Sequence, residues 1–243
     1  MLYIGVLRIK KEDNIDLLMK SLPEKTAERL SARRNEKERR LSAGAYSLLS
    51  KLYKKALGTD DEMPQILYTG EGKPYFEEEK DNKGLQNEVK FSISHDEEVA
   101  VVALSLHDGE VGVDVQSEPK RRINLEKIAE RFFSPFRNTK EVVEREKIEK
   151  GDISISFYKI ENGQICDAEE TGFSISDTPS EFLMRWTLLE ASLKASSYGF
   201  SKVEDRDAIV NRMRTRSFAL ALFDREYAVS VAIMKQKDLE GRK

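Results

Sequence analysis

The stretch Glu110-Val-Gly-Val-Asp-Val-Gln116 decides how this chain is interpreted. Its valines alternate with Gly112, Asp114 and Gln116, and this period of two predicts a strand. The valines then face the core, while one carboxylate and one amide lie on the opposite face. Residues 89–94 and 99–106 also have strand patterns, so the three segments together predict an antiparallel meander.

A second stretch, Trp186-Thr-Leu-Leu-Glu-Ala-Ser-Leu-Lys194, complements the first. Trp186, Glu190 and Lys194 recur every fourth residue, so they share one line along a helix. Asp114 and Glu190 provide oxygen ligands of the kind that Mg²⁺ prefers, and Gln116 adds an amide oxygen. Lys194 supplies an ammonium beside them. The alternatives are a surface-facing acid at Asp114 and an ordinary helical ion pair between Glu190 and Lys194.

Size and composition define the class of protein. The chain has 243 residues, 39% hydrophobic and 35% charged, which suits one large domain or two small ones. No apolar run is long enough to span a bilayer and the N-terminus lacks a cleavage site, so we expect a cytoplasmic protein that binds no membrane. One cysteine, Cys166, excludes an internal disulfide framework and, with only two histidines, argues against a zinc cluster.

The net charge of −3 gives no general reason to expect a nucleic-acid partner. One basic run lies between Arg29 and Arg40 and contains Arg33, Arg34, Lys37 and Arg39 as well. Such a run is either a solvated helix face or a site for an anion. A nucleic-acid binder with a basic helix is the alternative that the acidic balance and the lack of a stacking motif discount.

The remaining pattern predicts helices and hairpins. A helix begins near Pro23, and apolar periodicity from Leu41 to Ala56 continues until Gly58, as one long helix or a broken pair. Residues 70–76 form a loop. Residues 153–160 and 164–166 flank Asn162-Gly163, a strong hairpin signal, and 217–223 with 226–234 form a final hairpin.

Two short segments resemble each other and indicate an internal duplication. Residues 96–103 and 224–231 share Asp, Glu, Ala and Val at matching positions, an echo that either reflects duplication or arises by chance in hairpins. Duplication predicts an α+β fold, a pseudo-twofold pair of small helix-plus-antiparallel-sheet units with a ligand cleft between them. We place the halves at residues 1–118 and 119–243.

Three further side chains are suited to binding phosphate. Ser94 and His95 end a predicted strand and can donate to phosphate oxygens, or they can simply cap a turn and meet solvent. Lys73 lies between Gly72 and Pro74 in a stiff turn, as a point charge for a phosphate or as a solvated loop lysine.

Taken in order, these segments resemble the surfactin-synthetase-activating type of 4′-phosphopantetheinyl transferase. The resemblance rests on the following pieces: Pro23-Glu-Lys25 with the basic helix, Gly72-Lys-Pro74, Phe91-Ser-Ile-Ser-His95, Gly112-Val-Asp114, Arg131-Phe-Phe-Ser134, and Trp186 to Lys194. It implies transfer of the 4′-phosphopantetheine arm of coenzyme A to a serine of an acyl or peptidyl carrier protein. Two similar halves would bind coenzyme A between them, and an internally duplicated chain would act as a monomer.

The resemblance also assigns roles. Asp114 and Glu190, with Gln116, would hold Mg²⁺, and Lys194 would screen charge on the phosphate. Glu190 would take the proton of the carrier serine, directly or through a metal-bound water. The groups expected to bind coenzyme A, besides Lys194, are Lys25, Arg40, Ser94 and His95 at its 3′-phosphate end and Lys73 with Pro74 near its nucleotide or pyrophosphate.

Four features depart from the family pattern. Gln116 replaces a frequent second acid, Leu189 replaces a lysine, and Glu28 stands where a second phosphate-binding lysine is usual, unless Arg29 or Arg33 substitutes. The segment 135–177 is longer than the usual connection and lies where carrier contacts are expected. These changes motivate an alternative from another class, a degenerate relative that binds coenzyme A or a carrier protein without transfer.

Overall fold

The computed structural model of the protein describes residues 1–77, 89–106, 109–118, 147–168, 173–176, 181–196, 206–222 and 225–234. Its helices are α1 (Ile15–Met19), α2 (Glu24–Ser31), α3 (Glu36–Leu57), α5 (Glu181–Ser196) and α6 (Arg206–Asn211), with a 3-10 turn, η2, at Lys150–Asp152. Its strands are β1 (Leu2–Arg8), β2 (Ile66–Tyr68), β3 (Pro74–Phe76), β4 (Val89–Asp96), β5 (Val99–Leu106), β6 (Glu110–Ser117), β7 (Ile153–Glu161), β8 (Gln164–Asp167), β9 (Phe173–Ser176), β10 (Arg214–Leu222) and β11 (Arg225–Met234).

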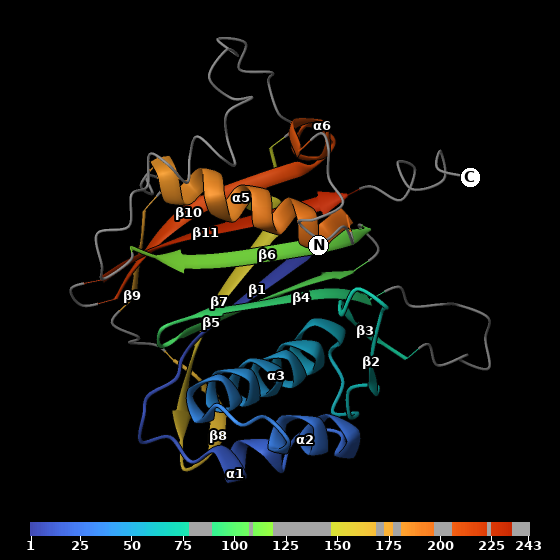
Figure 1. Ribbon diagram of the computed structural model, residues 1–243, viewed down its shortest axis with the longest axis vertical. Helices are drawn as coiled ribbons and strands as arrows, with labels where there is room; N and C mark the ends of the chain where they lie inside the picture. The colour runs from blue at the N-terminus through green and yellow to red at the C-terminus, as the bar shows by residue number, and fades with distance from the viewer. Residues whose placement is uncertain are drawn as a thin grey trace.

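Two sheets stack face to face between outer helices, which gives four layers (Figure 1). The first sheet has the order β4-β5-β1-β7-β8 and the second β6-β11-β10-β9. Alternation along β5 explains the layering, because Val99 and Val101 join the core between the sheets while Ala100 and Val102 join the core under α3. A third hydrophobic cluster lies between α5, α6 and β11.

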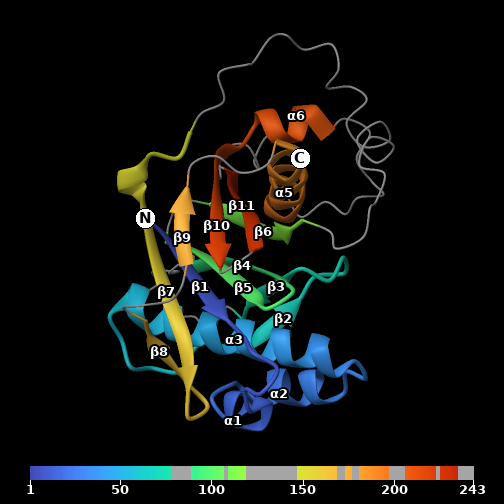
Figure 2. The same ribbon diagram turned by 90° about the vertical axis from the view of Figure 1, so that its left-hand side faces the viewer.

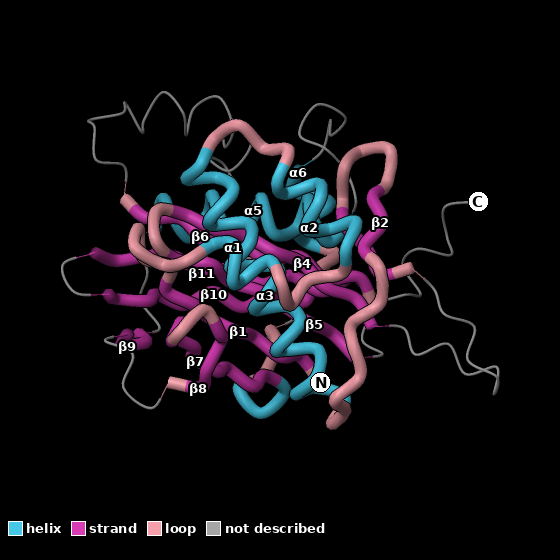
Figure 3. Tube along the Cα trace, turned by 90° about the horizontal axis from the view of Figure 1, so that it is seen from below, coloured by secondary structure: helices cyan, strands magenta, loops and turns pink. Residues whose placement is uncertain are grey.

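The first sheet is covered by α1, α2 and α3 (Figure 3). Asn35 begins α3, because its side chain accepts the backbone N–H of Glu38 at 3.1 Å. Gly58 ends the helix in a left-handed conformation with φ of 63°. The helical region predicted from Pro23 to Gly58 is therefore a broken pair, α2 and α3.

Both sheets are built from the same succession of elements, a strand, a helix and a hairpin. In the first unit these are β1, α3 and β4–β5, and in the second they are β6, α5 and β10–β11. The second hairpin strand lies in the middle each time, as β4-β5-β1 and β10-β11-β6. A Cβ added to Gly5 or Gly112 would meet the helix of its own unit. This repetition confirms the predicted α+β class and the duplicated helix-plus-sheet unit.

The predicted three-stranded meander is wrong in its last strand. β4 and β5 pair as an antiparallel hairpin, but β6 leaves this sheet and pairs with β11, with Val113 opposite Val231. The valines of β6 face the core between the sheets, so the predicted alternation is correct even though the neighbour is not. Within the segment 70–76, predicted as a loop, residues 74–76 form the short strand β3, which pairs with β2.

The hairpin predicted at Asn162-Gly163 is confirmed, as β7 and β8. Both turn residues have positive φ, 50° and 75°, as a type I′ turn requires. β7 runs parallel to β1 and so adds the hairpin to the first sheet (Figure 2). The halves placed at 1–118 and 119–243 stay a prediction, but this part of the long segment 135–177 belongs with the first sheet.

Some predicted features lie outside the described residues. These are the Arg131–Ser134 motif and Asp224 in the internal echo. None of the described helices is long and apolar enough to cross a membrane.

Candidate active site

The two informative stretches meet where α5 packs on the outer face of β6. Gly112 makes this contact possible, because a Cβ there would lie 1.9 Å from the carbonyl oxygen of Ala191 and 2.6 Å from the nitrogen of Ala195. The helix backbone therefore rests directly on the strand. Glu190 directly precedes Ala191, and Lys194 directly precedes Ala195. The contact therefore brings both side chains close to Asp114, which lies two residues after Gly112 on the same face of β6.

Asp114 is buried, with 3% of its surface exposed, so the alternative of a surface-facing acid is wrong. Its Oδ1 accepts hydrogen bonds from Lys194 Nζ at 2.7 Å and from Ser94 Oγ at 2.8 Å. Lys194 also donates to the carbonyl of Val113 at 3.1 Å. The pair of Asp114 and Lys194 thus joins β6 to α5 by a charge-assisted hydrogen bond.

The second oxygen of Asp114 is placed differently from the first. Oδ2 is buried and receives no hydrogen bond from the described residues. Such a buried carboxylate oxygen is costly unless something with positive charge or a proton faces it. The neighbouring group is the carboxyl of Glu190, which has no proton to donate when it is ionised.

The surroundings of Glu190 change the pKa of its carboxyl group. Burial first, and then repulsion from Asp114, raise the pKa of Glu190 from 4.5 to about 7. A hydrogen bond shared with Asp114 raises the pKa further, whereas Lys194 and the indole N–H of Trp186, which donates to Glu190, oppose the rise. Two carboxyls that repel each other in a confined place thus lie near one lysine, which bonds to Asp114.

These residues fit a divalent cation. A cation between Glu190 and Asp114 Oδ2 would supply the positive charge that this oxygen lacks and would relieve the repulsion of the two acids. Mg²⁺ is typically held by one or two carboxylates together with waters and substrate phosphates. Gln116 follows on the same strand and is half-buried. Among the described residues, no group of three or more His, Cys, Asp and Glu side chains comes together, so the candidate site has two acids.

Ser94 and His95 diverge, because neighbouring residues of a strand face opposite sides. Ser94 is buried against Asp114, whereas Arg33 and Lys194 act on His95 from nearby. Burial is the largest cause that lowers the pKa of His95, followed on the same side by Lys194 and Arg33, while Glu38 opposes them. The imidazole therefore favours its neutral form at neutral pH.

The basic groups on α2, on α3 and in the connection between them have distinct surroundings. Arg33 donates to Ser42 Oγ at 2.8 Å. Arg40 is turned toward the loop after β1, where its Nη1 donates to the Lys11 carbonyl at 2.8 Å. Lys25 is exposed on α2. Of the residues considered as substitutes at the position of Glu28, Arg33 is the one placed beside His95.

Lys73 is held by a residue that the sequence did not single out. Its Nζ lies 2.5 Å from Glu110 Oε2, at the start of β6, and Pro74 follows it in β3. Lys90 Nζ lies 3.6 Å from the other oxygen of Glu110. Glu110 and Asp114 are four residues apart on one strand, so their Cα atoms lie about 13 Å apart along β6.

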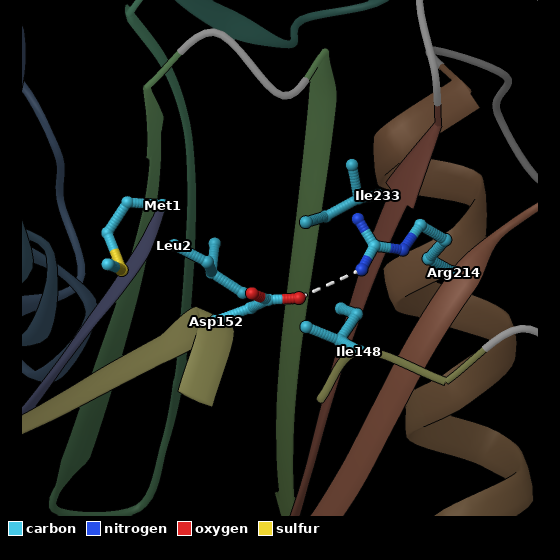
Figure 4. Close-up of a pocket in the computed structure, with 6 residues that line it drawn as sticks. All are labelled: Met1, Leu2, Ile148, Asp152, Arg214 and Ile233. Carbon is cyan, nitrogen blue, oxygen red and sulfur yellow. Dashed lines mark hydrogen bonds and ion pairs between the residues drawn. The ribbon is translucent and has the colours of Figure 1, made fainter. Parts of the chain in front are cut away.

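A small cavity lies elsewhere, at the opposite margin of the two sheets (Figure 4). Its volume is about 110 Å³, and it is lined by Met1, Leu2, Ile148, Asp152, Arg214 and Ile233. Arg214 Nη2 donates to Asp152 Oδ2 at 3.1 Å. This lining, drawn from the described part of the chain, includes none of the predicted site residues.

A comparison with protein families finds a match that lies within the first part of the chain. Residues 10–107 match the family model described as 4′-phosphopantetheinyl transferase, N-terminal. The match supports a member of the 4′-phosphopantetheinyl transferase family. It covers less than half of the 243 residues and includes Ser94 and His95, but it ends before Asp114. No curated protein sequence matches the chain.

Sequence reasoning found the acids and the lysine but missed several of their neighbours. It placed Trp186 in line with Glu190 without assigning it a role, although the four-residue spacing was the available signal. It did not find Glu110 as the partner of Lys73, because a contact between a turn and a distant strand leaves no local pattern. The contact of Ser94 with Asp114 was missed for the same reason.

Proposed function

We propose that this protein transfers the 4′-phosphopantetheine arm of coenzyme A to a serine of an acyl or peptidyl carrier protein, with Mg²⁺ as the cofactor. The observation that carries the proposal is the convergence of Asp114 and Glu190 beside Lys194, with Asp114 Oδ2 left without a donor among the described residues. The match of residues 10–107 to the transferase family supports the same chemistry.

The transfer forms a bond between the serine oxygen and the phosphorus that carries the pantetheine arm. The bond from this phosphorus to the oxygen of the adenosine 5′-phosphate breaks, and 3′,5′-adenosine bisphosphate leaves. Bound Mg²⁺ would be held by Asp114 and Glu190, with Gln116 nearby, and would neutralise and orient the pyrophosphate.

The protein's own residues supply the remaining requirements. Lys194, fixed by Asp114 Oδ1 and the Val113 carbonyl, places a positive charge where phosphate charge develops. Glu190 would take the proton of the serine hydroxyl. Trp186 orients this carboxylate through its indole N–H.

The coenzyme would extend from the acid pair toward the basic helices. His95 and Arg33 are close to each other and to the Lys194 side of the site, which suits the 3′-phosphate end. Arg40 and Lys25, proposed for the same phosphate, lie on α3 and α2. Lys73 stands at the far end of β6, where it would approach the nucleotide or pyrophosphate in competition with Glu110.

The direct test is incubation of the protein with coenzyme A, Mg²⁺ and a panel of apo-carrier proteins from fatty-acid, polyketide and peptide synthesis. Mass spectrometry should show a gain equal to the phosphopantetheine arm on at least one carrier. The gain should disappear in EDTA and return when Mg²⁺ is restored. If no carrier gains mass although coenzyme A binds, the catalytic proposal fails.

Glu190→Gln tests the role of the base. The amide cannot take a proton, and it is a weaker ligand, so we expect the transfer rate to fall by about 10²- to 10⁴-fold. Coenzyme A binding, measured by calorimetry, should be partly retained. Glu181→Gln is the matched control, because Glu181 lies exposed on the same helix and pairs with Arg185. Transfer at the wild-type rate by Glu190→Gln would exclude the assignment.

The degenerate-binder alternative rests on Gln116, Leu189 and Glu28. Leu189 is 1% exposed in the hydrophobic cluster between α5 and α6, so this change removes no group from the acid pair. Glu28 is exposed on α2, and Arg33 is available beside His95. Only Gln116 alters the neighbourhood of the acids themselves. The structure thus favours the active enzyme over the binder.

A further inference from the structure

β4 and β6 lie side by side at one margin of the sandwich, each at the edge of its own sheet. Backbone N–H groups of β6 that make no ladder bond with β11 donate hydrogen bonds to side chains of β4. Ser92 Oγ accepts the N–H of Val113 at 3.0 Å, and Asp96 Oδ2 accepts that of Ser117 at 2.7 Å. These contacts replace the backbone hydrogen bonds that an edge strand lacks on its outer side.

Ser94 is the middle contact of this series, and it makes more than one bond. Its Oγ faces the N–H of Val115 at 3.4 Å, accepts from Lys194 Nζ at 3.2 Å and donates to Asp114 Oδ1 at 2.8 Å. A hydroxyl has one hydrogen to donate and two lone pairs. All of them are engaged inside the protein, and the residue is only 8% exposed.

The two carboxylate oxygens of Asp114 therefore have different surroundings. Oδ1 receives both Ser94 and Lys194, whereas Oδ2 receives neither and lies buried. Two donors on one oxygen fix the plane of the carboxylate. The carboxylate cannot rotate to exchange its oxygens without breaking both bonds.

We propose that Ser94 is a positioning residue for Asp114, which keeps Oδ2 available to the divalent cation, and not a ligand of coenzyme A. The proposal rests on the proposed function, because it assumes that Asp114 holds a cation. It changes the role that the resemblance to the family implied for Ser94 at the 3′-phosphate. His95, on the opposite face of β4, keeps that role.

The test compares Ser94→Ala with Ser92→Ala and Ser94→Thr. Ser92 accepts the N–H of Val113 in the same manner, so its variant reports the loss of one edge contact of β6. Ser94→Thr keeps the hydroxyl. Three quantities are measured on each purified full-length variant: Mn²⁺ affinity by electron paramagnetic resonance, with and without saturating coenzyme A, coenzyme A affinity in EDTA by calorimetry, and thermal stability.

We expect Ser94→Ala to weaken Mn²⁺ binding by about 10-fold or more, as for the loss of other groups that orient a metal ligand. Coenzyme A affinity in EDTA should change by less than about twofold, since no contact with the coenzyme is removed. Ser92→Ala should leave Mn²⁺ affinity near wild type even if it lowers stability equally. Ser94→Thr should recover most of the Mn²⁺ affinity.

Several results would overturn the inference. Weaker coenzyme binding with unchanged Mn²⁺ affinity would make Ser94 a coenzyme ligand. An equal loss of Mn²⁺ affinity in Ser92→Ala and Ser94→Ala would reduce its role to sheet contact. If Mn²⁺ binding depends on Ser94 but no carrier is modified, the transferase proposal fails while the positioning role stands. Absence of Mn²⁺ binding to the wild type under both conditions would contradict both.

Discussion

Glu190 is the residue whose ionisation is most closely tied to the site. In the folded protein burial and the Asp114 carboxylate raise the pKa of Glu190 from 4.5 to about 7. The folded state therefore holds a proton that the unfolded chain has already released over this range. A cation between the acids would favour the ionised form of Glu190 and so oppose the shift, because proton and metal compete for one place.

The pH dependence of stability follows from this shift. Without divalent cations, the contribution of Glu190 is fully present below pH 4.5 and is lost as pH rises through about 7. The loss is up to roughly 3 kcal/mol, at about 1.4 kcal/mol for each pKa unit. Urea unfolding in EDTA between pH 4.5 and 8 should show this decline in the wild type relative to Glu190→Gln.

Mg²⁺ should restore stability to the wild type at pH 8 and have little effect on Glu190→Gln, because a ligand that binds only the folded state stabilises it. Glu181→Gln serves again as the control and should follow the wild type. Parallel pH curves for wild type and Glu190→Gln in EDTA would show that folding does not raise the pKa of Glu190.

At the scale of elements, the contact between β6 and α5 positions the proposed catalytic groups. Gly112 has no space for a side chain, since an added Cβ would meet the backbone of α5 at Ala191. The helix backbone cannot yield as a flexible side chain can. A methyl group there must push the helix away and carry Glu190 and Lys194 with it.

Gly112→Ala should therefore abolish transfer and lower the free energy of unfolding by about 1–3 kcal/mol. Gly70→Ala is the matched control, because nothing lies within 4 Å of a Cβ added there. Urea unfolding and the carrier assay on both variants give the comparison. A Gly112→Ala protein with wild-type transfer would mean that the helix and strand need not touch for the site to work.

Local sequence patterns predicted the elements of the site better than their neighbours. The valine alternation in 110–116 and the four-residue spacing from Trp186 to Lys194 each follow from the geometry of one element, and both are observed. The pairing of β6 with β11 was not predictable in this way. It depends on a strand late in the chain, whereas proximity in sequence favoured β5.

At the scale of the whole molecule, duplication accounts for the position of the site. The two units meet where β4 and β6 run side by side, and the acid pair lies at this meeting, with Ser94 and His95 from one unit and Asp114, Glu190 and Lys194 from the other. The echo between 96–103 and 224–231 indicated two units. It could not show which edges meet, because side-chain contacts between edges leave no repeat in the sequence.

The most direct measurement is a crystal structure of the protein with coenzyme A and Mn²⁺, using the anomalous signal of manganese. We expect one peak between Asp114 Oδ2 and Glu190, within about 2.0–2.4 Å of an oxygen of each, as for octahedral divalent cations. The pyrophosphate should complete its coordination beside Lys194. A manganese peak that neither carboxylate touches, or two carboxylates that point away from each other, would contradict the central claim.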